Sequence, residues 1–275
     1  MPKYSRRAVE FPRGFVYNKS KIIDSGREDA ALGQIMAVIS GKGGTGKTSL
    51  CAGIASCLAA EGARVLCIDA DVGLRNLDIS LGLADRAVVP FTSVMDGTYG
   101  LSAAAEHPGI PGLFLLTAPV TEEAESLDPA MFGAMLGAVR EKFDWCLIDA
   151  PAGVGAGFRL ATAFADRLAV VCTGDPASLR DAARAVDLAG ADASAASLIV
   201  NRVSGRLFGR MSATVDDVMD GVGLPLLGVV PEDVNVTLAA ARAVPLVLYT
   251  GRGAAEACLR IARRLSGKRV PLMRL

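Results

Sequence analysis

One stretch of eight residues, 41–48, constrains this 275-residue chain more than any other. It reads Gly-Lys-Gly-Gly-Thr-Gly-Lys-Thr and fits the phosphate-loop pattern G-x-x-x-x-G-K-[ST]. An apolar, partly β-branched run at 35–40 precedes it, and a run rich in Ala and Leu at 49–60 follows. Because glycines let backbone N–H groups converge on an anion at a helix N-terminus, this order of strand, loop and helix predicts a nucleotide site. A glycine-rich turn without a ligand is the alternative.

The residues of this loop have separate expected roles. Lys47 would contact the β- and γ-phosphates, and the hydroxyl of Thr48 would ligate Mg²⁺. The expected phosphate-binding residues are Gly41, Lys42, Gly43, Gly44, Thr45, Gly46, Lys47, Thr48 and Ser49.

From residue 35 onward, short apolar strands alternate with helical segments. This pattern predicts an α/β fold with a mostly parallel, doubly wound sheet covered on both faces, in one domain spanning 34–275. Residues 1–33 lack strong periodicity and are expected to form an irregular, mildly basic N-terminal extension. The expected strands are 35–40, 64–69, 113–117, 145–149, 168–173, 197–201 and 226–230, with 246–248 as a candidate edge strand. The expected helices are 48–61, 129–142, 179–189, 213–220, 234–243 and 254–265.

Composition narrows the class of protein. Lys plus Arg and Asp plus Glu both number 29, so net charge favours neither nucleic acid nor membrane as a partner. The six cysteines lie in apolar patterns without a C-x-x-C pair, which indicates core residues of a reducing compartment. No apolar run approaches the ~20 residues of a membrane-spanning helix, and no secretory signal is evident. We expect a cytoplasmic protein.

Carboxylates follow two of the expected strands. Asp69 and Asp71 end the strand at 64–69, where Asp71 could orient or deprotonate an attacking water and Asp69 could help to hold Mg²⁺. Helix or loop capping is the alternative for this pair. Asp149 ends the expected strand at 145–149 and is placed to hold Mg²⁺ through water. Gly153, a few residues later, can present its N–H to a γ-phosphate.

Later strand ends supply weaker candidates. The amide of Asn201 suits the edge of adenine, and Arg202 would cover the face of the base. Ser178 is a candidate helix N-cap, and Asp233 is expected to cap the helix that follows it. His107, the only histidine, is expected to be a surface residue without a role.

The second lysine of the loop, Lys42, changes the interpretation. The loop with this lysine resembles the deviant form found in the MinD/ParA family of SIMIBI-type P-loop ATPases, and the similarity covers roughly residues 34–270. Residues 71–82 resemble the segment that follows the second strand in the MinD branch, whereas partition ATPases usually have a Pro-Gln-Gly run there. Flagellar-number regulators share much of it but usually lack the arginine at 75.

The resemblance implies an ATPase that hydrolyses ATP to ADP and phosphate with Mg²⁺. It implies an ATP-bound, face-to-face homodimer in which Lys42 reaches the partner's nucleotide and Asp71 positions the hydrolytic water. It also implies an adenine contact for Asn201, a base wall at Pro231 and a protein regulator of hydrolysis.

The C-terminus departs from the family pattern. MinD proteins usually continue into a membrane-inserting amphipathic helix, and from Pro271 and the few residues after it we expect no such helix here. Six basic residues follow Glu256 without an acid, and lipid or DNA could be their partner. We favour a docked last helix, held by Leu259, Ala262 and Leu265, with a solvated basic face.

Several functions remain open. The favoured one is an ATP-dependent switch in spatial positioning, such as division-site selection, acting in the cytoplasm or peripherally at the inner face of the membrane. The alternatives are a DNA-partition ATPase that binds nonspecific DNA, a flagellar-number regulator, and a nucleotide-gated adaptor with little turnover.

Overall fold

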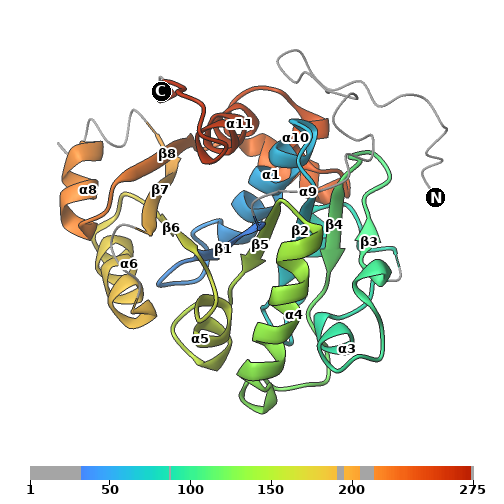
Figure 1. The fold of residues 1–275 in the computed structure, drawn as a ribbon. Coiled ribbons are helices and arrows are strands. Elements are labelled where there is room, and N and C mark those ends of the chain that lie inside the picture. The colour runs from blue at the N-terminus through green and yellow to red at the C-terminus, as the bar shows by residue number, and fades with distance from the viewer. Residues whose placement is uncertain (1–31, 87, 191–194, 205–213, 274–275) are drawn as a thin grey trace.

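The computed structural model describes residues 32–86, 88–190, 195–204 and 214–273. Within these residues the frame is an eight-stranded sheet in the order β3-β4-β2-β5-β1-β6-β7-β8 (Figure 1). Neighbouring strands run parallel, except that the short β3 pairs antiparallel with β4. The strands are β1 (Gln34–Ile39), β2 (Val65–Asp69), β3 (Ala105–Glu106), β4 (Leu113–Leu116), β5 (Trp145–Asp149), β6 (Arg167–Cys172), β7 (Ala196–Val203) and β8 (Leu226–Pro231).

Helices cover both faces of this sheet (Figure 1). Alternate residues of β1 point into opposite layers: Met36 and Val38 join the core under α1, α10 and α11, whereas Ile35 and Ala37 join the core under α4, α5, α6 and α8. The helices are α1 (Lys47–Ala60), α2 (Leu77–Ser80), α3 (Phe91–Met95), α4 (Pro129–Lys142), α5 (Ala156–Thr162), α6 (Pro176–Ala189), α8 (Val215–Val222), α9 (Val234–Ala241), α10 (Leu246–Tyr249) and α11 (Ala254–Leu265).

The predicted fold class is confirmed, with one wrong element. Residues 246–248 are not an edge strand but lie in α10, because Leu246 and Val247 are buried in the core beneath α1 and α11. The predicted N-terminal extension lies outside the described residues up to position 31, so its boundary stays a prediction.

Of the predictions for single residues, two are wrong and one is confirmed. Ser178 is not the N-cap of α6; Asp175 is, and its carboxylate accepts the N–H of Ser178 at 3.0 Å. His107 is not a surface residue: it is buried, its Nδ1 accepts the N–H of Gly109, and burial lowers its pKa to about 4. Asp233 caps α9 as predicted.

Two predictions about the core are confirmed. All six cysteines are buried and free. Helix α11 docks through Leu259, Ala262 and Leu265, as expected. The carboxyl ends of β1, β2 and β5 to β8 meet at one edge of the parallel sheet, and the predicted site residues follow them there.

Candidate nucleotide-binding site

The phosphate loop joins β1 to α1 and forms the centre of the site. Gly44 (φ 79°) and Gly46 (φ 89°) adopt the left-handed backbone conformation that glycine tolerates without strain. Gly46 is the N-cap of α1, and no side chain caps that helix. The first N–H groups of α1 are therefore available at the loop for an anion.

Asn201, at the end of β7, holds the loop from a neighbouring strand. Its Nδ2 donates to the carbonyl oxygen of Thr45 at 2.7 Å, in a buried contact. A Cβ on Gly46 would lie 2.3 Å from that Nδ2, so a larger residue would displace the Asn201 amide from Thr45. The adenine contact of Asn201 stays a prediction, as do those of Arg202, which is exposed, and Pro231, which ends β8.

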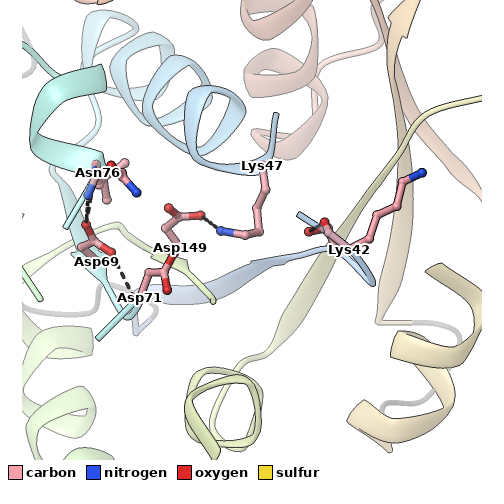
Figure 2. A network of polar contacts seen from close by, with 8 residues as sticks. Lys42, Lys47, Asp69, Asp71, Asn76 and Asp149 are labelled. Carbon is pink, nitrogen blue, oxygen red and sulfur yellow. Dashed lines mark hydrogen bonds and ion pairs between the residues drawn. The ribbon is translucent and has the colours of Figure 1, made fainter. Parts of the chain in front are cut away.

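A buried ion pair crosses the site. The Nζ of Lys47 lies 2.5 Å from Oδ1 of Asp149, and these residues are only 6% and 1% exposed (Figure 2). The second oxygen of Asp149, Oδ2, is buried and has no hydrogen-bond partner among the described residues. Burial raises the pKa of Asp149 to about 6, although the charge of Lys47 acts to lower it. Oγ1 of Thr45 is likewise buried and unpartnered within that part of the chain.

The end of β2 brings two further carboxylates close to this pair, on the same side of Lys47 (Figure 2). Asp69 is fully buried: its Oδ1 accepts the N–H of Asp71 at 3.0 Å, and its Oδ2 accepts the N–H groups of Asn76 and Leu77 at 3.1 and 3.0 Å. Asp71 is half-buried. Burial raises the pKa of both carboxyl groups, while Lys47 lowers it.

Lys42 points away from these carboxylates (Figure 2). Its Nζ lies 3.0 Å from Oδ1 of Asp175, and both side chains are about 40% exposed, at 36% and 45%. A hydrogen bond from the hydroxyl of Thr173, together with the N–H of Ser178 and Lys42, lowers the pKa of Asp175 to about 2. This pairing was not predicted from the sequence. The Asp-Pro-x-Ser pattern could have identified Asp175 as a helix cap, but nothing local links it to a lysine 133 positions away.

The chemistry of the donors fits Mg²⁺ held together with phosphate. Within the described ranges, no group of three or more His, Cys, Asp and Glu side chains could hold a metal ion. Mg²⁺ commonly binds one or two protein oxygens and completes its shell with phosphate and water, and Thr48 with the unpartnered Oδ2 of Asp149 offers such a half-site. Beyond β5, Gly153 (φ 85°) has open space around it, where a ligand can approach its backbone.

Comparisons with known proteins agree with this geometry. Residues 36–246 match the family described as CobQ/CobB/MinD/ParA nucleotide binding domain. The septum site-determining protein MinD of Synechocystis sp. is 35% identical over 246 residues, which cover 88% of this chain and 92% of that protein.

Solved structures extend the likeness to three dimensions. The MinC:MinD cell division protein complex of Aquifex aeolicus matches with a TM-score of 0.80 and 33% identity, covering 88% of this chain and 98% of that one. The septum site-determining protein MinD of Pyrococcus horikoshii, complexed with Mg-ADP, matches with a TM-score of 0.74 and 26% identity, covering 85% and 96%. The chain therefore belongs to the CobQ/CobB/MinD/ParA family of nucleotide-binding domains.

Proposed function

We propose that this protein is a Mg²⁺-dependent ATPase that hydrolyses ATP to ADP and phosphate and serves as an ATP-dependent dimerisation switch in spatial positioning. The observation that carries the proposal is the buried pair of Lys47 and Asp149, whose Oδ2 lacks a partner. Unpartnered buried polar atoms are rare in folded proteins, and a site that completes its bonding with a nucleotide and a metal accounts for this one.

Each residue has a role in this reaction. The N–H groups of the loop and of α1 bind the phosphates, and Lys47 moves from Asp149 to the β- and γ-phosphates. Thr48 and Asp149 hold Mg²⁺, which supplies neutralisation of phosphate charge when bound. Asp71 orients the attacking water and accepts its proton, and a carboxylate whose pKa is raised by burial is better suited to that task. Gly153 donates its N–H to the γ-phosphate.

The exposed apolar side chains support a face-to-face dimer. Large apolar residues are exposed on segments that follow β2, β4 and β8, at the edge of the sheet that carries the phosphate loop; they are Leu74, Ile79, Val120, Val234 and Leu238. A second copy of the chain would bury these side chains and bring Lys42, already exposed on the loop, to the partner's nucleotide.

The favoured biological role is division-site selection or related cell organisation, in the cytoplasm or peripherally at the membrane. Relatives named as septum site-determining proteins support this role, and the MinC:MinD complex supports a protein regulator. No helix among the described residues is long and apolar enough to cross a membrane. The basic residues of α11 engage acids and carbonyl groups of the chain, which disfavours them as a surface for lipid or DNA.

Phosphate release from ATP tests the enzymatic proposal. We expect Lys47→Ala to lose ATP binding and turnover; a variant that binds and hydrolyses ATP as well as the wild type would contradict it. Lys42→Ala should keep nucleotide binding but lose ATP-dependent dimerisation in light scattering, and unchanged dimerisation would remove the role across the interface.

Co-sedimentation of the ATP-loaded protein with anionic liposomes, beside a DNA pull-down, tests the output of the switch, with ADP as the control. Salt-sensitive DNA binding would favour a partition ATPase. Binding to neither surface would favour a protein partner.

A further inference from the structure

The side chain of Asp69 joins the two ends of the loop that connects β2 to α2. Within the loop, Arg75 pairs with Asp78 and the N–H of Gly73 donates to the carbonyl of Pro119. One oxygen of its carboxylate accepts the N–H of Asp71 where the loop begins, and the other accepts the N–H groups of Asn76 and Leu77 where it ends. Figure 2 shows Asp69 between Asp71 and Asn76, with a contact to each. The carboxylate thus spans the whole loop.

The far end of this loop is fixed in the core. Leu77 is fully buried, and Asp78, which follows it, is 4% exposed. Asn76, the N-cap of α2, makes no side-chain capping bond, so the N–H groups of Asn76 and Leu77 depend on Asp69, while that of Ile79 donates to Asp78. Asp69 therefore ties the backbone of Asp71 to a buried element.

The bonding capacity of Asp69 is largely used by these contacts. An ionised carboxylate has about four acceptor positions, and three are occupied by backbone N–H groups. Asp149 differs: one of its oxygens meets Lys47 and the other has no partner among the described residues. Of the two carboxylates, Asp149 has the free oxygen that a metal ion needs.

We propose that Asp69 is a positioning residue that anchors the loop carrying Asp71, in place of the Mg²⁺-ligand role that the sequence suggested. This inference rests on the proposed ATPase function, because Asp71 is the residue that would contact the attacking water. Asp69 acts through the backbone of Asp71, and its loss lets the loop between 71 and 77 open and misdirects the carboxylate of Asp71.

The substitution Asp69→Asn tests the proposal with little change in volume, since an amide cannot accept from all three N–H groups. We expect kcat to fall about 10- to 100-fold, as for other residues that orient a reacting group. The Mg²⁺ concentration for half-maximal activity and the affinity for ATP should stay unchanged. Hydrogen exchange of residues 71–77 should become faster in the nucleotide-free protein. Asp149→Asn is the matched control, and it should shift the Mg²⁺ dependence without faster exchange in that loop.

A higher Mg²⁺ requirement in Asp69→Asn with unchanged exchange would overturn the proposal, and so would a variant that behaves as the wild type. Gly73→Ala guards against a variant that fails to fold: Gly73 has φ 88° and open space around it, so alanine strains only the loop backbone. It should give a smaller loss of kcat, again without a change in Mg²⁺ dependence; a shifted Mg²⁺ dependence or full activity would count against the loop anchor. Exchange needs no turnover, so it still tests the anchoring if the wild type hydrolyses no ATP.

Discussion

Asp149 and Glu61 are carboxylates that both pair with basic residues, and their surroundings differ in an instructive way. Asp149, at the phosphate loop, pairs with Lys47 and lies beside the hydroxyl of Thr48; its buried Oδ2 has no hydrogen-bond partner among the described residues, and burial raises its pKa to about 6. Glu61, after α1, meets Arg263 with one oxygen and Lys268 with the other. Burial alone would raise the pKa of Glu61, but these two partners lower it.

The region around Glu61 is saturated with such contacts. Arg260 bonds Glu256 and the carbonyl of Pro271, while Arg264 bonds the carbonyls of Leu227 and Val270. Four residues of the basic cluster therefore find partners within the chain, namely Arg260, Arg263, Arg264 and Lys268. These paired charges hold the last helix and the segment after it in place, whereas the carboxylate with an unpartnered buried oxygen marks the site.

Replacing Asp149 should have the largest effect on activity and so tests this contrast most directly. We expect Asp149→Asn to lower kcat by at least about 100-fold, the size of loss typical of a group that stabilises charge at a reacting centre. The fold should survive, because a buried charge is replaced by a neutral amide that can still accept from Lys47. Phosphate release measures the loss of activity, and thermal unfolding of the nucleotide-free protein measures stability. Loss of both activity and fold would mean that Asp149 has a structural role as well as a functional one.

The same residue should give the protein an unusual pH dependence. The pKa of Asp149 is about 6 in the folded protein against 3.8 for an ordinary aspartate, so the folded state holds a proton between these values that the unfolded state has released. The unfolding free energy should therefore fall as pH rises from about 4 to about 6, by up to ~3 kcal/mol at ~1.4 kcal/mol per pKa unit. Urea unfolding of the nucleotide-free wild type and of Asp149→Asn at several pH values checks this prediction. If the unfolding free energies of both proteins change with pH in the same way, the prediction is refuted.

In the saturated region, substitution should affect stability alone. Arg264→Gln removes guanidinium bonds to two carbonyl oxygens, and we expect it to lower the unfolding free energy by about 1 to 2 kcal/mol with unchanged ATP turnover. Arg269→Gln is the control, because Arg269 is exposed and makes no side-chain bond or ion pair within the described ranges; it should change stability by less than about 0.5 kcal/mol. Reduced turnover in Arg264→Gln would mean that this region also serves the site.

The sequence predicted much of this architecture because its signals are local. Apolar strands, helix periodicity and the phosphate loop all depend on residues within a few positions of one another. The short apolar run at 246–248 was assigned wrongly because three apolar residues suit a strand or a helix turn equally well, and only packing under α1 decides.

The partners across the site could not be predicted in this way. Asn201 reaches Thr45 over 156 positions, and Lys42 reaches Asp175 over 133. Such contacts exist only because the parallel sheet brings the ends of β1, β6 and β7 together, so the order of the strands has to be known first. His107 was likewise misjudged, since its burial depends on how the segment around it folds back.

The smallest expected effect is at the partly exposed pair of Lys42 and Asp175. If Lys42 leaves Asp175 to reach a partner's nucleotide, removing the carboxylate favours the dimer. Exposed ion pairs contribute at most about 1 kcal/mol, so Asp175→Ser should tighten ATP-dependent dimerisation by about two- to five-fold while serine keeps the cap of α6. Asp187→Ser removes the same charge near the other end of α6 and should leave dimerisation unchanged. Sedimentation equilibrium with ATP measures both. Weaker dimerisation in Asp175→Ser would mean that the ion pair stabilises the dimer. Lys42 would then have a structural role, like the paired basic residues near Glu61.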